Sequence, residues 1–440
     1  MIGYAIFFFG GDTPHPSFHT LIPIIGVALV IGFSSREEIV GKALGSKPLV
    51  WVGLISYSLY LWHFPIFAFS RLGLLFSSNY DRMGWILLAL ILSIVSYYWI
   101  ELPFRNSSKV SKRAFLFALS VSTIALVTGA SFIIGSKGFP ARLPPILLKS
   151  AGELAVPTWD RLSQAGVGCH GRMEKFCYFG KGDDATNVYI FGDSHFSAIA
   201  KELAEALSED FNYLEANLDQ CPFVLGITGV IYNGSSLPTQ CNDTFEQKRL
   251  SEISVEPSVI IVGGRFPLYL EGTFFDNFEG GVEGGGTGKL STTDDVPLED
   301  LVRKTYQSLL DNGHHLVILY PIPNVGWNLP QEFLRRFKNA DAQISIDELR
   351  VNPITTSYEV YRQRTKSSFD LFDSVTHQNI HRVYPHQLFC DLEIKARCVT
   401  HDTEFLYYYD DDHPSVKGAE MITSLLVDAV AIAGVELRSQ

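Results

Sequence analysis

The stretch Val188-Tyr-Ile-Phe-Gly-Asp-Ser-His195 decides the fold of the second half of the chain. Its first four residues are apolar or aromatic, which is typical of a strand buried on both faces of a sheet. Gly192 and Asp193 end this run, and a helical pattern follows from about Phe196 to Leu207. A buried strand that leads directly into a helix is the repeating unit of parallel α/β sheets.

The same alternation continues along the chain. Further buried strands are predicted at residues 259–262, 316–320 and 381–384, and helices at 298–310, 358–375 and 416–432. Strands that alternate with helices predict a parallel sheet covered by helices on both faces, with functional sites at the carboxyl ends of the strands. Ser194 stands at one such end. Residues 279–288 contain six glycines and are predicted to form a flexible inserted loop.

Residues 1–135 have a different pattern. Apolar runs dominate them, at residues 21–33, 49–69, 85–100 and 115–134. Because a helix needs about 20 apolar residues to cross a bilayer core, we expect these runs to form transmembrane helices. The sequence therefore predicts transmembrane helices over residues 1–135, a linker over 136–185 and an α/β domain over 186–440.

Charge predicts the orientation of these helices and excludes one class of partner. Basic residues gather in two of the connecting loops, namely Arg36, Lys42, Lys47, Arg105, Lys109, Lys112 and Arg113. Loops rich in Lys and Arg stay in the cytoplasm, so we expect the chain after about Ser136 to lie outside it. Residues 1–139 carry ten Lys and Arg against five Asp and Glu, whereas the remaining residues carry 25 against 42. An acidic second part without a basic stripe argues against binding of nucleic acid.

The cysteines support the same topology. All six follow the last apolar run, and they form three neighbouring pairs, Cys169–Cys177, Cys221–Cys241 and Cys390–Cys398. Short loop closure favours disulfides within these pairs, although six cysteines allow other connectivities. No pair has a tight Cys-x-x-Cys spacing, so disulfides are favoured over zinc and no metal site is predicted. Disulfides indicate an oxidising compartment.

Ser194 is the candidate nucleophile. A serine hydroxyl reacts well only when a base takes its proton and a third group orients that base. Tyr409-Asp-Asp-Asp-His-Pro-Ser415, just before the last predicted helix, offers His413 as the base and Asp410 as its orienting carboxylate. Each motif alone also has a structural explanation, since Gly-Asp-Ser often caps a helix and Asp-x-x-His is common on surfaces. Their joint occurrence in one α/β domain favours catalysis.

Three further ionisable residues adjoin these motifs. His195 follows the candidate nucleophile and is expected to be exposed or to cap the helix. Asp411 and Asp412 are expected to be solvated, although either of them could replace Asp410 as the orienting carboxylate.

These motifs resemble those of the SGNH (GDSL-like) hydrolases, whose first block is Gly-Asp-Ser and whose last is Asp-x-x-His. The chain more closely resembles SGNH domains fused to membrane acyltransferase-3 proteins, which O-acetylate bacterial surface polysaccharides. The resemblance implies Ser194 as nucleophile, His413 as general base and Asp410 as its partner. Gly264-Arg265 stands in the third block without the family's Asn. We therefore expect the oxyanion donors to include the Gly264 amide, with Arg265 either as a charged helper or paired with a carboxylate.

The membrane part carries the same resemblance. Residues 51–65, Trp-Val-Gly-Leu-Ile-Ser-Tyr-Ser-Leu-Tyr-Leu-Trp-His-Phe-Pro, and residues 98–105, Tyr-Trp-Ile-Glu-Leu-Pro-Phe-Arg, are similar to late helices of the acyltransferase-3 family. His63 and Glu101 are ionisable at membrane depth, which suggests a functional site. Equally, His63 could end a helix and Glu101 could pair with Arg105. The resemblance implies that the chain covers only the late helices, with the earlier ones encoded separately or upstream.

The resemblance implies an O-acyltransferase of a bacterial inner membrane with a periplasmic SGNH domain. Its acceptor would be a polysaccharide or lipid-linked glycan, such as lipopolysaccharide O-antigen. Acetyl-CoA would be the ultimate acyl donor, and no cofactor would be bound tightly. Two alternatives stay open. If water attacks the acyl-enzyme, the same triad makes an acetylesterase, and a decayed site would leave a membrane-tethered glycan-binding module.

Overall fold

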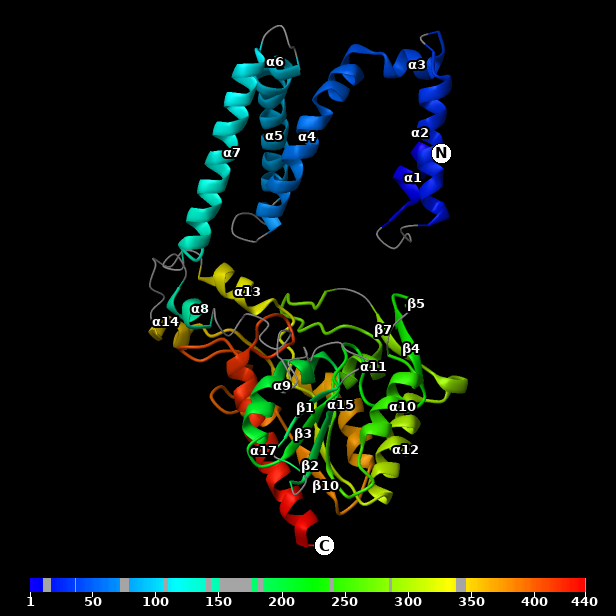
Figure 1. Ribbon diagram of the computed structural model, residues 1–440, viewed down its shortest axis with the longest axis vertical. Helices are drawn as coiled ribbons and strands as arrows, with labels where there is room; N and C mark the ends of the chain where they lie inside the picture. The colour runs from blue at the N-terminus through cyan, green and yellow to red at the C-terminus, as the bar shows by residue number, and fades with distance from the viewer. Residues whose placement is uncertain are drawn as a thin grey trace. The chain divides into compact units, whose positions relative to one another are not determined.

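The computed structural model describes most of the chain. The described residues are 1–10, 17–35, 37–71, 79–105, 110–139, 144–150, 176–180, 182, 185–237, 241–284, 287–337 and 346–439. They form two compact units, Met1–Gly135 and Ser136–Gln440, which are labelled by element in Figure 1.

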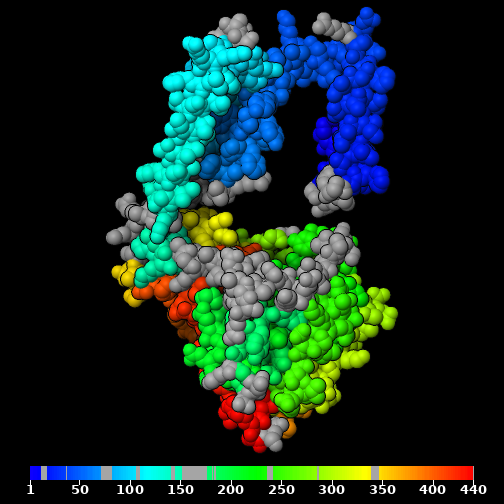
Figure 2. Space-filling view, in the orientation of Figure 1, coloured from blue at the N-terminus to red at the C-terminus, as the bar shows by residue number. Residues whose placement is uncertain are grey.

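The first unit is helical. Its elements are α1 (Ile2–Phe8), η1 (Phe18–Thr20), α2 (Leu21–Phe33), α3 (Ile39–Leu44), α4 (Lys47–Arg71), α5 (Asn79–Ser96), the π-helix η2 (Tyr97–Glu101), α6 (Leu102–Arg105) and α7 (Lys112–Gly135). Helical stretches at residues 47–70, 82–105 and 112–135 are long and apolar enough to cross a membrane, and 18–33 is a shorter apolar helix. The described helices thus coincide with the predicted apolar runs. No residue of α7, cyan in Figure 2, is buried, as expected of a surface that faces lipid or other helices.

The second unit is built on a six-stranded sheet. Its strands are β1 (Cys177–Phe179), β2 (Asn187–Phe191), β3 (Asn212–Glu215), β6 (Val259–Gly263), β8 (His315–Leu319) and β10 (Ile380–Val383), in the order β1-β3-β2-β6-β8-β10. All neighbouring pairs are parallel except β1 with β3. Smaller sheets pair β4 (Ile227–Tyr232) with β5 (Ser235–Leu237) and β7 (Gly288–Thr292), and β9 (Thr355–Ser357) with β11 (Arg397–Val399). The predicted parallel α/β fold is confirmed.

Helices cover both faces of this sheet. The helices are α8 (Pro145–Ser150), α9 (Ser194–Leu207), α10 (Asp243–Glu252), α11 (Phe266–Glu271), α12 (Leu298–Asp311), α13 (Leu329–Arg336), α14 (Ile346–Val351), α15 (Tyr358–Ser374), α16 (His386–Phe389) and α17 (Val416–Ser439), with a 3₁₀ turn η4 (Thr293–Asp295). Val188 and Ile190 belong to the core that includes buried residues of α9 and α17. Tyr189 and Phe191 point to the other core, which includes residues of α10, α12 and α15. The alternation explains why the whole run Val188–Phe191 is apolar.

The last helix, α17, is apolar enough over its 24 residues to count as a candidate span by composition. Its packing provides another explanation of that composition. Leu426 and Val430 are fully buried in the core of the α/β unit, whereas Ile432 is 54% exposed. An apolar face that packs against α9 and the sheet makes α17 a core helix of this unit.

The glycine-rich segment at residues 279–288 differs from the prediction of a flexible loop. Its described residues are hydrogen-bonded to the rest of the unit, since Glu283 N donates to Phe275 O and Asn277 N donates to Gly281 O. The Glu283 side chain is buried. Glycine is needed here partly because a Cβ on Gly281 would collide with the Asn277 side chain. Composition alone does not reveal these contacts.

The packing of α17 leads to a prediction about stability. Leu426→Ala should lower the free energy of unfolding of the α/β unit by about 2–5 kcal/mol, because it removes buried apolar contacts and leaves a cavity. Ile432→Ala, in the same helix, should change it by less than about 0.5 kcal/mol. Thermal unfolding of the full chain in detergent measures both. Equal effects of the two substitutions would contradict this packing.

Candidate active site

The turn between β2 and α9 presents Ser194. Asp193 is the N-cap of α9, and its Oδ1 accepts a hydrogen bond of 3.0 Å from His195 N. Ser194 is therefore the first residue of the helix, with its hydroxyl at the carboxyl end of a central strand. Gly192 permits the tight turn, because a Cβ there would collide with the Phe196 ring.

The Asp193 carboxylate joins this turn to the one that follows β6. Its Oδ2 accepts hydrogen bonds from Arg265 N at 2.6 Å and from the Tyr269 hydroxyl at 2.7 Å. Asp193 is fully buried. Gly264 lies against this carboxylate with φ +134°, and a Cβ on it would collide with Asp193. Position 264 thus requires glycine for both its backbone conformation and its close contact.

A buried arginine, whose role the sequence did not reveal, stabilises the same turn by hydrogen bonds to backbone carbonyl groups. Arg249 of α10 donates to Gly192 O at 3.1 Å and to Cys221 O at 3.2 Å. Its counterion is Glu246, at 3.1 Å, and both side chains are fully buried. Burial raises the pKa of Glu246 to about 7, against the opposing charge of Arg249. Cys221 forms a disulfide with Cys241 next to this pair.

The loop before α17 presents His413 to Ser194. The Asp410 carboxylate shapes this loop, because its Oδ1 accepts from Asp412 N at 3.1 Å and from His413 N at 2.7 Å. His413 Nε2 lies 2.8 Å from Ser194 Oγ. The structure therefore brings Ser194 together with Asp410 and with His413, which follows Ser194 by 219 residues in the chain.

Two carboxylates face the other nitrogen of His413. Nδ1 lies 2.9 Å from Asp410 Oδ2 and 2.7 Å from Asp412 Oδ1. Because an ionised carboxylate only accepts hydrogen bonds, Nδ1 carries a proton, and in the neutral imidazole Nε2 is the nitrogen that accepts the serine proton. Burial disfavours the charged imidazole, but the charge of Asp412 and the hydrogen bonds to both carboxylates outweigh it and place the pKa of His413 well above its usual value.

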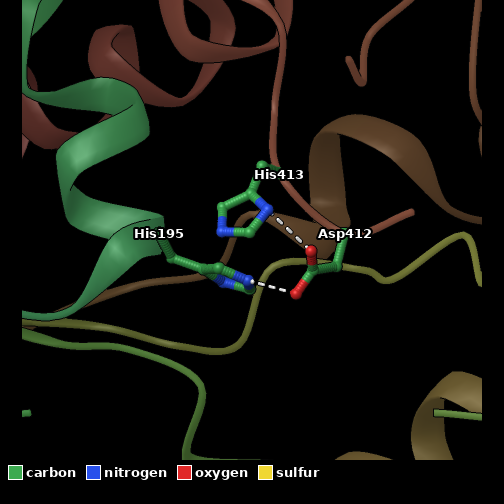
Figure 3. A group of neighbouring side chains, drawn as sticks. All are labelled: His195, Asp412 and His413. Carbon is green, nitrogen blue, oxygen red and sulfur yellow. Dashed lines mark hydrogen bonds and ion pairs between the residues drawn. The ribbon is translucent and has the colours of Figure 1, made fainter. Parts of the chain in front are cut away.

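Asp412 and His195 correct two expectations from the sequence. Asp412 is buried rather than solvated, and its carboxylate contacts both imidazoles, one with each oxygen, as Figure 3 shows. Its Oδ2 accepts from His195 Nε2 at 3.0 Å, so His195 is a buried member of the site and not an exposed residue. Both predictions were wrong because the beginning of α9 packs directly against the 410–415 loop.

The Arg265 side chain also contacts Asp412. Its Nη2 lies 2.8 Å from Asp412 Oδ2 and 2.9 Å from Glu283 Oε2, so of the two expectations for this residue the structure shows pairing with carboxylates. Glu283 also accepts from Asn324 Nδ2 at 2.6 Å. Burial raises the pKa of Glu283 to about 7, and the charge of Asp412 adds to this effect while Arg265 opposes it.

A small cleft adjoins this network. Its lining includes His195, Gly264, Arg265, Glu283, Asn324 and Arg364. The cleft therefore borders both the backbone that follows β6 and the imidazole that follows Ser194. A small ligand in it would meet polar and charged groups on several sides.

The predicted cysteine pairs can be checked against the described residues. Cys390 and Cys398 form a disulfide, as do Cys221 and Cys241, whereas Cys169 of the third predicted pair lies outside the described residues.

In the helical unit, His63 Nδ1–H donates to Leu59 O at 3.1 Å within its own helix. Glu101, in the π-helix η2, pairs with Arg105 at 3.0 Å and accepts from Ser58 Oγ at 3.0 Å. The local pair with Arg105 that the sequence suggested is therefore present.

The arrangement around Ser194 has the parts that acyl transfer through serine requires. A histidine positioned by a carboxylate can take the serine proton, and amides at the beginning of a helix can stabilise a negative oxygen. A buried carboxylate in contact with the histidine stabilises the imidazolium that forms when the histidine takes this proton.

Comparison with known proteins identifies the family of the chain. The family model described as "SGNH domain (fused to AT3 domains)" matches residues 166–428, more than half of the chain. Peptidoglycan O-acetyltransferase OatA of Listeria monocytogenes is 27% identical over 92 residues, which are 20% of this chain and 15% of that protein. O-acetyltransferase OatA of Staphylococcus aureus is 30% identical over 135 residues, which are 28% of this chain and 20% of that protein.

A solved structure is also similar. It is the periplasmic domain of the lipopolysaccharide acetyltransferase of Salmonella ser. Paratyphi A, with a TM-score of 0.38 and 15% identity over 57% of this chain and 85% of that one. The matched segments cover a fifth or less of the two OatA proteins. The extent of the family match decides the assignment: the chain belongs to the family of SGNH domains fused to AT3 domains.

Proposed function

We propose that this chain is the SGNH-bearing part of an O-acyltransferase that places acetyl groups on a bacterial surface polysaccharide. The observation that carries the proposal is the contact of 2.8 Å between Ser194 Oγ and His413 Nε2, with carboxylates on the opposite nitrogen. The names of the related O-acetyltransferases support an acetyl group as cargo and a cell-surface polymer as acceptor. Lipopolysaccharide O-antigen and peptidoglycan are the two acceptors to test.

The proposed reaction has two halves. Ser194 Oγ attacks the carbonyl carbon of the acetyl donor, its proton passes to His413 Nε2, and the leaving group departs with that proton. This step leaves an acetyl ester on Ser194. A sugar hydroxyl then attacks the ester, His413 takes its proton, and the proton returns to Ser194 Oγ as the acetylated sugar leaves. Asp410 orients the imidazole in both halves.

The negative oxygen of each tetrahedral intermediate requires hydrogen-bond donors. We assign the amides of Ser194 and Gly264 to this task, because the Asp193 carboxylate places their two turns side by side. The Arg265 guanidinium pairs with Asp412 and Glu283. It therefore adds positive charge to the site but does not donate a hydrogen bond to the intermediate.

The location and the donor are part of the same proposal. We place the helical unit in a bacterial inner membrane and the α/β unit in the periplasm, supported by the apolar helices, the disulfides Cys221–Cys241 and Cys390–Cys398 among the described residues, and the basic loops. Acetyl-CoA is the proposed ultimate donor of the complete system, with no cofactor bound tightly to this chain. Its proposed partners are the bilayer, a polysaccharide or lipid-linked glycan and further acyltransferase-3 helices.

The role of Ser194 can be tested with the full chain in detergent and a chromogenic acetyl ester. Ser194→Ala should lower turnover by at least about 10³-fold, because the nucleophile is lost. Ser424→Ala, which changes an exposed serine of α17, should have no effect. Turnover by Ser194→Ala at the wild-type rate would refute the proposed nucleophile.

The same protein can be given a defined oligosaccharide of O-antigen or of peptidoglycan together with the acetyl ester. Acetyl transfer to sugar in preference to water supports the transferase. Hydrolysis alone would indicate an acetylesterase, and glycan binding without any turnover would indicate a binding module. Mass spectrometry of the oligosaccharide distinguishes these outcomes and shows which acceptor is used.

Gly264 provides a second test of the site. Gly264→Ala should lower kcat by about 10²-fold, because a Cβ would strain the backbone and collide with the Asp193 carboxylate, which would move the Gly264 amide out of position. Gly229→Ala is a matched control, since a Cβ there meets no atom within 4 Å. Kinetics with the acetyl ester and thermal unfolding measure both variants. A Gly264→Ala enzyme as active as Gly229→Ala would exclude the Gly264 amide from the oxyanion site.

A further inference from the structure

Two carboxylates, not one, face the Nδ1 side of His413. The Asp-x-x-His spacing assigns only Asp410 to this position, yet Asp412 Oδ1 is the nearer oxygen, at 2.7 Å against 2.9 Å for Asp410 Oδ2. We propose that Asp412 is a second positioning residue for His413, kept ionised and in place by Arg265. This inference rests on the proposed function, because it assumes that His413 is the base for Ser194.

Burial makes Asp412 the stronger electrostatic partner. The Asp412 side chain is 3% exposed, whereas that of Asp410 is 26% exposed. Charges interact more strongly where water is excluded, so equal distances give unequal energies. Asp410 has a second task, because its other oxygen accepts the amides of Asp412 and His413 and shapes the loop. The two carboxylates therefore have different roles. Asp410 shapes the loop through hydrogen bonds to its amides, and Asp412 provides a buried negative charge beside His413.

The Asp412 charge is compensated from a distant part of the sequence. Arg265 lies 2.8 Å from its Oδ2, and Glu283 in turn lies 2.9 Å from Arg265. Glu283 is fixed by Asn324 Nδ2 and by the amide of Phe275. This arrangement holds the pKa of Asp412 well below its usual value, since burial is outweighed by the charges of Arg265 and His413. The glycine-rich segment is thus linked to His413 by three side chains in successive contact, Glu283, Arg265 and Asp412.

A metal site is the competing explanation of the same residues. His195, Asp412 and His413 place ligand atoms within 4.8 Å of one another, which a metal ion could bridge. However, the Arg265 guanidinium lies on the carboxylate oxygen that also contacts His195, and a second cation there would be repelled. His413 Nε2 is directed to Ser194 rather than to a shared centre. The geometry therefore favours positioning over metal binding.

A positioning role of Asp412 predicts a change in the pH dependence of turnover that a purely structural role would not produce. The charged and titratable groups that face His413 and Asp412 come from several elements: Asp410, Asp411 and Tyr409 of the same loop, His195 of α9, Arg265 after β6 and Glu283 of the glycine-rich segment. A negative Asp412 makes His413 harder to deprotonate at rest. It also stabilises the imidazolium that forms when His413 takes the Ser194 proton.

Removal of the Asp412 charge should therefore have two effects: it should make His413 available as a base at lower pH, and it should make the reaction slower at high pH. In Asp412→Asn, the His413 imidazolium loses one proton at lower pH and becomes the neutral base, so the rise of kcat/KM with pH should move toward acid. The plateau of kcat at high pH should fall by about tenfold or more, because the imidazolium is less stabilised in the transition state. The measurement is a pH profile of acetyl-ester turnover by the full chain in detergent.

Two further variants make the result decisive. Arg265→Gln removes a positive charge, so it should move the rise of kcat/KM toward higher pH, opposite to Asp412→Asn. Asp411→Asn removes the neighbouring carboxylate, which makes no contact with His413 among the described residues, and should change the profile less than Asp412→Asn does. Thermal unfolding in the same detergent reports whether each variant is folded.

The outcomes separate this inference from the proposed function. Loss of turnover in Ser194→Ala together with an unshifted profile and an unchanged plateau in Asp412→Asn would overturn the inference alone. Shifts of the same sign in Asp412→Asn and Arg265→Gln would also overturn it. Turnover that does not depend on Ser194 would instead refute the proposed function. Stoichiometric binding of Zn²⁺ that Asp412→Asn abolishes would favour the metal explanation.

Discussion

The buried Asp193 carboxylate is the contact on which the rest of the site depends. It accepts the amide of His195 on one oxygen, and the amide of Arg265 and the hydroxyl of Tyr269 on the other. A buried carboxylate is stable only when donors satisfy it, so the turn after β2 and the turn after β6 must lie together. This one constraint places Ser194 at the start of α9, requires glycine at position 264 and brings the Arg265 side chain to Asp412.

Two groups of buried or largely buried ion pairs lie next to this contact. Arg249 and Glu246 lie beneath the Ser194 turn, and Arg265 with Glu283 and Asp412 lies beside it. Such pairs add little net stability, because the cost of removing charges from water offsets most of their attraction. Their contribution here is rigid placement of polar groups around a small cleft, which catalysis by positioned charges requires.

Some of this was predictable from the sequence and some was not. The run Val188–Phe191 and its repeats along the chain predicted the parallel sheet, because burial on both faces leaves only apolar residues. Ser194, His413 and Asp410 were found by their spacing next to a strand and a helix.

The roles of His195, Asp412, Arg249 and Glu283 depend on contacts between residues far apart in the chain. Nothing in a local pattern distinguishes a buried charge from a solvated one. The sequence therefore suggested an exposed or helix-capping His195, and a solvated Asp412 with a role beside His413 only as an alternative to Asp410.

Covalent catalysis through Ser194 can be tested by trapping the acyl-enzyme. The full chain would be mixed with a chromogenic acetyl ester, quenched in acid within the first turnover and digested for mass spectrometry. One acetyl group is expected on the peptide that contains Ser194, and turnover without acetylation of that peptide would contradict covalent catalysis through Ser194.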